Sequence, residues 1–162
     1  MTTATSTIPA SSDTDRIERS IVINASRPRV WRALSNAEEF GDWFGVNLKG
    51  KTFTPGLRVQ GQFTIKGHEH CVFDIVVERI EPEQLLSYRW HPYSMDPKID
   101  YEKEQRTVVT FTLKDAGDGT LFTVLETGFD NVLPERRLEA FRMNSRGWDA
   151  QMGCLQRHVT TQ

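Results

Sequence analysis

Apolar and polar residues alternate along much of the chain, which is the pattern of strands with one buried face. The first such segment runs from Ile17 to Ile23. A longer region, 46–127, keeps the period of two, and turn residues separate its apolar runs. Short turns between consecutive strands favour an antiparallel arrangement. The strands expected in that region cover about 59–65, 71–80, 86–90, 109–113 and 122–124.

Two short helices are expected between the first strand and the longer strand region. Ser26 is a typical N-cap residue, and Pro28 fits a first helical turn because the N–H groups there have no intrahelical partner. Ser35 and Glu38 have the spacing of a capping box, which predicts a second helix that ends near Gly41. The order expected from the N-terminus is therefore strand, helix, helix.

The most regular helical pattern covers about 134–159. On a helical wheel, one narrow side carries the large apolar residues Phe141, Trp148, Met152, Leu155 and Val159. A stripe of this length needs a large partner, and the predicted sheet is the one element that supplies it. The sequence therefore predicts an α+β fold in which a long C-terminal helix packs across a curved antiparallel sheet.

Length and composition limit the number of domains and the classes of partner. The 162 residues have room for one domain, and the Ser- and Thr-rich residues 1–15 predict a disordered leader before a single domain at 16–162. The 20 Lys and Arg against 22 Asp and Glu give a net charge of −2, which argues against nucleic acid as a partner. Two cysteines and no long apolar run predict a cytoplasmic protein without membrane insertion.

The N-terminal half of the long helix carries the first candidate site. Arg137 and Asn144 fall on the same side as Phe141 and Trp148. One interpretation is that they are polar anchors for a ligand in an internal apolar pocket. The other is that they reach the rim of the helix and hydrogen-bond to backbone there.

Glu126 is the second candidate, because alternation places it on the same face as Phe122 and Val124. A carboxyl group that faces inward must be paired or protonated, and either state suits an anchor or a general acid/base. If the strand has reached the sheet edge at this point, Glu126 is instead solvated.

Two further segments are candidates for a cavity entrance. Trp43 and Phe44 stand next to glycines and are expected on a loop, where large rings close a cavity or plug the core. The stretch 91–105 is longer than a hairpin needs and contains Tyr93 and Tyr101. It predicts a lid or a surface for a protein partner, with a plain exposed loop as the alternative.

Other catalytic chemistry finds little support in the sequence. His68 and His70 share one side of an extended segment, but two ligands without a third are too few for zinc. Cys71 and Cys154 lie in settings that do not activate a nucleophile. No nucleotide, cofactor or hydrolase motif is present. We therefore expect no metal and no cofactor.

Five segments carry a resemblance to a known family: IVINASRPRVWRALSN, WFG, IEPEQLLSYRW, DGTLFTVLETGFD and RRLEAFRMNSRGWDAQMGCLQRHV. Their order resembles the SRPBCC superfamily, also called START-like or helix-grip proteins. Within it, the chain is most similar to the branch of heat-shock ATPase activator homologues, which includes polyketide-cyclase-like proteins. The resemblance covers residues 17–159.

The resemblance implies a six- to seven-stranded sheet around the long helix, two short helices after the first strand, and an apolar cavity between helix and sheet. By position in the matching segments, the resemblance also implies which residues line this cavity. Alternation adds Phe111 to these residues, and the helical wheel adds Arg137. The complete predicted ligand-binding set is Trp43, Phe44, Trp90, Phe111, Phe122, Val124, Glu126, Arg137, Phe141, Asn144 and Trp148. Many relatives carry His where this chain has Glu126, so the resemblance implies no His-based chemistry at that position.

The leading functional hypothesis is the binding of a small apolar or amphipathic molecule of the lipid, sterol or aromatic polyketide class. Glu126, Asn144 or Arg137 would orient its polar end. One alternative is a cyclase or hydratase that uses Glu126 as its acid/base. The other is a co-chaperone-like module that acts through a protein partner, although such activators carry a further N-terminal domain that the residues before Ile17 are too few to form. We expect a monomer or a weak dimer.

Overall fold

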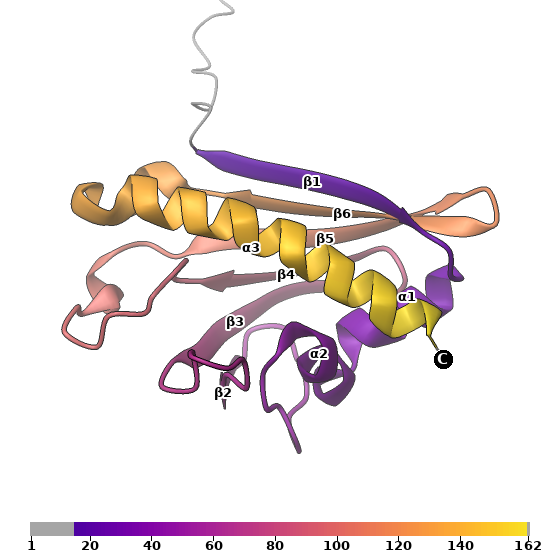
Figure 1. The fold of residues 1–162 in the computed structure, drawn as a ribbon, viewed down its shortest axis with the longest axis horizontal. Helices are drawn as coiled ribbons and strands as arrows, with labels where there is room; N and C mark the ends of the chain where they lie inside the picture. Colours follow the sequence, from indigo (N-terminus) through magenta and orange to yellow (C-terminus); the bar gives the residue numbers. More distant parts are fainter. Residues whose placement is uncertain (1–14, 162) are drawn as a thin grey trace, which may run out of the picture.

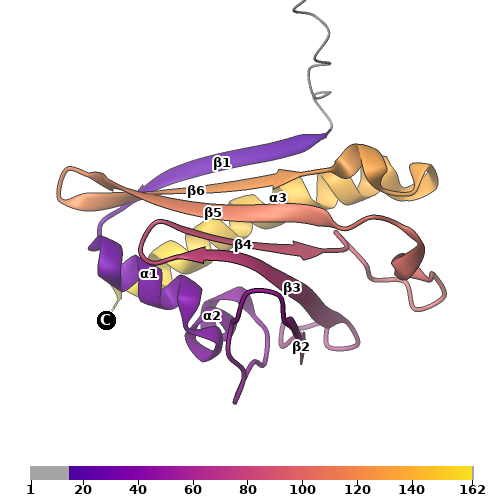
Figure 2. The same ribbon diagram turned by 180° about the vertical axis from the view of Figure 1, so that it is seen from behind.

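A computed structural model describes residues 15–161 of the protein. Six antiparallel strands form one curved sheet in the order β1-β6-β5-β4-β3-β2. The long helix α3 lies across one face of this sheet (Figure 1), and Figure 2 shows the sheet from the opposite side. The strands are β1 (Arg16–Ile23), β2 (Arg58–Gln62), β3 (Val72–Glu81), β4 (Leu85–Trp90), β5 (Thr107–Ala116) and β6 (Gly119–Thr127). The predicted α+β fold is therefore confirmed.

The helices are α1 (Arg27–Ser35), α2 (Ala37–Phe44) and α3 (Pro134–Thr160), with short 3-10 turns η2 (Tyr101–Lys103) and η3 (Phe129–Asn131). Both α1 and α2 lie beside the C-terminal half of α3 (Figures 1 and 2) and contact it. The predicted leader falls almost entirely outside the described residues. Its last residue, Asp15, is described, and its carbonyl oxygen accepts hydrogen bonds from the N–H groups of Gly128 and Phe129.

The first helix begins as its sequence predicts, and the second does not. Ser26 caps α1 by accepting a hydrogen bond from the N–H of Arg29. The N-cap of α2 is Asn36, whose side chain accepts from the N–H of Glu39 at 2.9 Å. The predicted capping box at Ser35 is wrong, because the Ser35 hydroxyl instead donates back to a carbonyl within α1.

The end of α2 also differs from the prediction. The helix continues through Gly41 to Phe44 and ends at Gly45, which has a φ of +94°. This left-handed conformation favours glycine. Gly41 is needed for a different reason, since a Cβ there would lie 2.2 Å from the carbonyl oxygen of Val46. Trp43 and Phe44 therefore lie on a helix, and the expectation of a loop at these two residues is wrong.

Helix α3 matches the predicted long helix closely, with 27 residues. Its buried residues include Trp148, Leu155 and Val159 of the predicted stripe, whereas Phe141 is half-buried. The buried face also contains Arg136, which the helical wheel did not select. Within residues 15–161, no helix is both long and apolar enough to cross a membrane.

Strand register brings the ends of β4, β5 and β6 together beneath the middle of α3. Trp90 of β4 lies opposite Thr107 of β5, and Val109 of β5 lies opposite Glu126 of β6. Because side chains alternate between the faces of a strand, these pairings place Trp90 and Glu126 within reach of one another on the face that α3 covers. The fold thus gathers polar side chains from three elements under one helix.

Candidate ligand-binding site

A buried carboxylate lies at the centre of the site. Glu126 is fully buried, and its Oε1 accepts hydrogen bonds from Asn144 Nδ2 at 2.9 Å and Trp148 Nε1 at 2.8 Å. Its Oε2 accepts from Trp90 Nε1 at 2.8 Å and from the Thr107 hydroxyl at 2.6 Å. Four donors from β4, β5 and α3 therefore converge on one carboxyl group of β6.

The chemistry of these donors indicates whether Glu126 is ionised or protonated. Indole and amide nitrogens only donate, so three of the four contacts require an acceptor. Of the four contacting atoms, only the Thr107 hydroxyl oxygen can also accept a hydrogen bond from a protonated Glu126. Burial raises the pKa of Glu126 above its usual value, while the four hydrogen bonds favour the ionised form. The geometry thus matches an ionised carboxylate whose negative charge is stabilised by neutral hydrogen-bond donors.

Tyr88 is the second buried polar group near this centre. It is fully buried, and its hydroxyl has no hydrogen-bond partner among the described residues. Burial, together with the negative charge of Glu126, raises the pKa of Tyr88 well above its usual value. The phenol is therefore neutral, and its ring packs against Phe73, Trp90 and Phe111.

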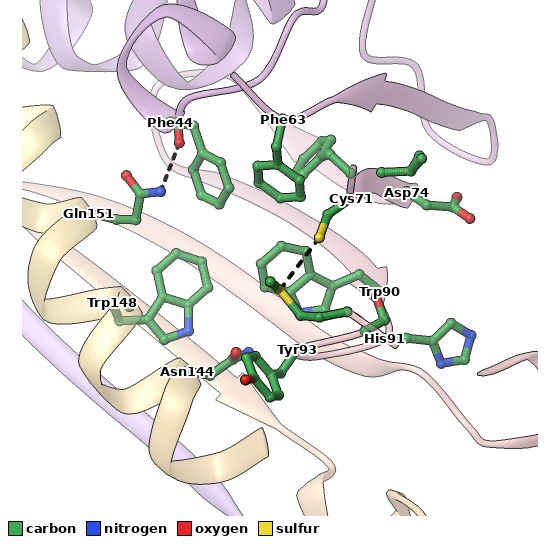
Figure 3. Close-up of a pocket in the computed structure, with 15 residues that line it drawn as sticks. Phe44, Phe63, Cys71, Asp74, Trp90, His91, Tyr93, Asn144, Trp148 and Gln151 are labelled. Carbon is green, nitrogen blue, oxygen red and sulfur yellow. Dashed lines mark hydrogen bonds between the residues drawn. The ribbon is translucent and has the colours of Figure 1, made fainter. Parts of the chain in front are cut away.

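A pocket of about 160 Å³ lies in front of this network, between α3, α2 and the sheet (Figure 3). Six of its lining residues are Phe, Tyr or Trp, and they come from α2, the β2–β3 region, β4, the segment 91–105 and α3. Trp90 and Trp148 stand on neighbouring walls, with ring centroids 5.9 Å apart. The complete lining is Phe44, Phe63, Cys71, Val72, Phe73, Asp74, Trp90, His91, Tyr93, Ser94, Met95, Asn144, Gly147, Trp148 and Gln151.

Four residues of the predicted ligand-binding set line this pocket: Phe44, Trp90, Asn144 and Trp148. Glu126 is not in the lining. It lies behind the pocket wall and holds the indole nitrogens of both tryptophans and the amide nitrogen of Asn144. The structure therefore gives Glu126 a positioning role toward the three pocket residues.

The other predicted residues lie elsewhere. Trp43 donates from its indole nitrogen to the carbonyl oxygen of Ala33 at 2.8 Å and belongs to the core between α1 and α2. Arg137 donates twice to the carbonyl oxygen of Val132, as the rim interpretation expects. Four apolar residues of the set pack within the core or against it and do not line the pocket: Phe111, Phe122, Val124 and Phe141.

The segment 91–105 is tied to α3 by a buried ion pair. Arg136 donates to both carboxylate oxygens of Glu104 and to the carbonyl oxygen of Tyr93, and its guanidinium lies 4.6 Å from the ring centre of Tyr101. Burial alone raises the pKa of Glu104, but hydrogen bonds from His91 and Arg136 lower it to about 2. The segment is anchored at Glu104, and its residues 91 and 93–95 line the pocket.

Several pocket residues were not selected from the sequence. Gln151 follows Asn144 by seven residues, which places both on one side of a helix, so the helical wheel contained this signal. Cys71 and Met95 meet with 3.8 Å between their sulfur atoms, and no periodicity predicts a contact between a strand start and a loop. His68 and His70 lie between β2 and β3, and residues 15–161 hold no group of three or more His, Cys, Asp or Glu placed to bind a metal.

A curved antiparallel sheet that holds one long C-terminal helix over a pocket defines the helix-grip class of proteins. Residues 24–160 match the model of the family described as Activator of Hsp90 ATPase homolog 1-like protein, and the chain belongs to this family. The resemblance carried by the sequence motifs is confirmed by this match. No curated protein sequence matches the chain.

Solved structures share the fold. DynU16, from the dynemicin biosynthetic locus, aligns over 91% of this chain at 24% identity with a TM-score of 0.70; the chain spans only 48% of DynU16. Protein MLL2253 from Mesorhizobium loti aligns over 90% of this chain and 97% of its own length, at 25% identity and a TM-score of 0.67. CalU16 from Micromonospora echinospora aligns over 90% and 76% of the two chains, at 20% identity and a TM-score of 0.60.

Proposed function

We propose that the protein binds a small apolar or amphipathic molecule in the pocket between α3 and the sheet. The observation that carries the proposal is the set of hydrogen bonds from Trp90 and Trp148 to Glu126. Each bond fixes the orientation of a large ring in the pocket wall. Aromatic walls with a few placed polar groups are typical of small-molecule sites.

A glycine in α3 supports the same proposal. Gly147 lines the pocket in the middle of a 27-residue helix, and a Cβ there would meet nothing within 4 Å. A helix-interior glycine costs about 0.5–1 kcal/mol relative to alanine. Because neither packing nor backbone conformation requires Gly147, its missing side chain favours a role in keeping the pocket open.

The size of the pocket narrows the ligand class. Its volume of about 160 Å³ is close to that of an apolar cavity of about 150 Å³ that holds one benzene ring. Of lipids, sterols and aromatic polyketides, we therefore favour a ligand that inserts one aromatic ring. A larger molecule would extend out of the pocket into an adjoining hollow. This hollow is formed by the segment 91–105 and the start of β3, and it shares His91, Ser94 and Met95 with the pocket.

Two alternative functions receive less support from the site. A cyclase or hydratase would need Glu126 to touch its substrate. Each carboxylate oxygen of Glu126 already accepts two hydrogen bonds behind the pocket wall. An activator of a heat-shock ATPase would act through its surface, whereas the network around Glu126 is buried between α3 and the sheet. Stimulation of ATP hydrolysis by a purified heat-shock ATPase is the direct measurement of that second alternative.

NMR titration with 2-phenylethanol tests the proposal. We expect saturable shifts of the indole N–H signals of Trp90 and Trp148 and no shift of Trp43, which lies in the core. Gly147→Leu should fill the pocket and abolish these shifts, whereas Ala150→Leu, on the exposed side of α3, should leave them intact. Absence of saturable shifts up to the solubility limit of the probe, or equal affinity in Gly147→Leu, would overturn the proposal.

A further inference from the structure

Four nitrogen donors of the pocket wall are already engaged within the protein, and the ring nitrogens of His91 lie beside the carboxylates of Glu102 and Glu104. Trp90, Trp148 and Asn144 all donate to Glu126, and the side-chain nitrogen of Gln151 donates to the carbonyl oxygen of Phe44 at 2.9 Å. Figure 3 shows the amide of Gln151 turned toward Phe44. A ligand that needs a hydrogen-bond donor therefore meets wall nitrogens that are held by protein acceptors.

The side-chain oxygens of Asn144 and Gln151 remain for a ligand, since the oxygen of Gln151 has no hydrogen-bond partner among the described residues. Because Glu126 holds Nδ2 at 2.9 Å, the amide of Asn144 has a fixed orientation, and its Oδ1 lies on the other branch of the group. Asn144 is half-buried and lines the pocket. An amide oxygen accepts hydrogen bonds and never donates them. The fixed orientation of Asn144 therefore gives the pocket a preference for ligands that carry a hydrogen-bond donor.

The acidic side chains that line the pocket and the adjoining hollow fall into two groups: Asp74 and Glu102 pair with Arg58 and Arg106, whereas the others have no ion pair among the described residues. Glu126 contributes a buried carboxylate, and none of its four hydrogen-bonding contacts is a cation. Neither the pocket nor the adjoining hollow is lined by Lys or Arg among the described residues. Among the described residues, the carboxylates of Asp96 and Asp100 in that hollow receive hydrogen bonds only from the backbone N–H groups of Lys98 and Glu102. Because Glu126, Asp96 and Asp100 have no cationic partner among the described residues, their charges favour a negative potential in the pocket.

From these three observations we infer that the ligand carries a hydrogen-bond-donating polar group, with a protonated amine preferred over an alcohol, and that carboxylates and phosphates are rejected. This inference rests on the proposed function and adds to it the chemistry of the polar end. The amine donates to Asn144 Oδ1 and lies among aromatic rings that attract cations. An anion in the same place meets Glu126 with no compensating cation.

Three probes with one phenyl ring test the inference on the intact protein: 2-phenylethylamine, 2-phenylethanol and phenylacetate. We expect the amine to bind best and phenylacetate to bind at least about tenfold more weakly than the amine, because like charges across a desolvated contact repel strongly. Phenylacetate that binds as tightly as the amine overturns the inference while leaving the proposed function in place. Failure of all three probes to bind overturns the proposed function, and the inference with it.

Two variants connect the preference to named groups. Glu126→Gln removes the charge and should reduce the ratio of amine to phenylacetate affinity at least about threefold, with Glu135→Gln on the surface of α3 as control. Asn144→Ala removes the acceptor and should weaken the amine and the alcohol while ethylbenzene, which has no polar group, binds unchanged. Ser145→Ala, outside the lining, is its control. An unchanged ratio in a folded Glu126→Gln protein, or equal weakening of ethylbenzene in Asn144→Ala, contradicts the inference.

Discussion

Glu126 of β6 and Trp148 of α3 are joined by a buried hydrogen bond of 2.8 Å between carboxylate Oε1 and indole Nε1. The bond spans 22 residues of sequence and connects the sheet to the helix that covers it. It fixes the rotation of α3 at this point and holds the indole ring as one wall of the pocket. Stability and site geometry therefore depend on the same contact.

Trp148→Phe should lower both the stability and the ligand affinity of the protein. The substitution keeps an aromatic ring but removes a donor to a buried carboxylate, which is worth about 1.5–3 kcal/mol. Urea unfolding followed by fluorescence of the remaining tryptophans measures the first effect. NMR titration with 2-phenylethanol measures the ligand affinity. Weaker binding is expected because no hydrogen bond fixes the orientation of the phenyl ring.

Trp43→Phe is the matched control for this prediction. Trp43 also loses a buried indole hydrogen bond, to the carbonyl oxygen of Ala33. It should reduce the free energy of unfolding by about 1 kcal/mol, the usual value for a neutral hydrogen bond, and leave the affinity unchanged. Equal loss of affinity in both variants would mean that binding follows global stability and not the geometry of Trp148.

Alternation and the helical wheel were sufficient to place the principal site residues on the correct faces. The period of two directed Glu126 inward, and the wheel put Asn144 and Trp148 on the side of α3 that faces the sheet. Neither pattern predicts how far a given strand residue lies from a given helix residue. The convergence of four donors on one carboxylate depends on the register of β4, β5 and β6, which only the structure supplies.

The same limit explains the difference between Arg137 and Arg136. The wheel favoured Arg137 because it lies on the side of Phe141 and Trp148. The structure buries Arg136 instead, since its partner Glu104 comes from a long segment with no periodicity of its own. A contact made by an irregular loop leaves no repeated pattern in the sequence, so it was not predicted.

Gly147→Ala should stabilise the protein by about 0.5–1 kcal/mol, because alanine restricts the unfolded chain and its Cβ meets nothing within 4 Å. Thermal or urea unfolding measures the gain. Gly41→Ala provides the contrast, since its Cβ would lie 2.2 Å from the carbonyl oxygen of Val46 and should cost about 3 kcal/mol. Destabilisation by Gly147→Ala would show that Gly147 has a structural role that the pocket does not explain.

Glu104→Gln should destabilise the protein near neutral pH. The folded-state pKa of Glu104 falls from 4.5 to about 2, so the ionised group favours the folded state above the unfolded-state pKa. This contribution is about 2–3 kcal/mol, and it is lost as the pH falls from about 4.5 toward 2. The difference in free energy of unfolding between wild type and Glu104→Gln should therefore be largest at pH 7 and narrow below pH 4.5.

Urea unfolding at pH 7, 4 and 3 measures this pH dependence. Glu135→Gln, which changes an exposed carboxylate in the first turn of α3, should show a small difference at every pH. A Glu104→Gln difference that stays constant from pH 7 to 3 would exclude the ion pair with Arg136 as its source.

Bound ligand should protect Cys71 from alkylation. Cys71 lines the pocket, is 5% exposed, and has its Sγ 3.8 Å from Met95 Sδ at the mouth. Burial raises the pKa of this thiol, so its reaction with iodoacetamide at pH 7.5 should be slow, and saturating 2-phenylethylamine should slow it further. Mass spectrometry of peptides at timed intervals gives the rate at each cysteine. Cys154, half-buried on α3 and outside the lining, should react at the same rate with and without the amine, whereas protection of both cysteines would indicate a general tightening of the fold and not occupation of the pocket.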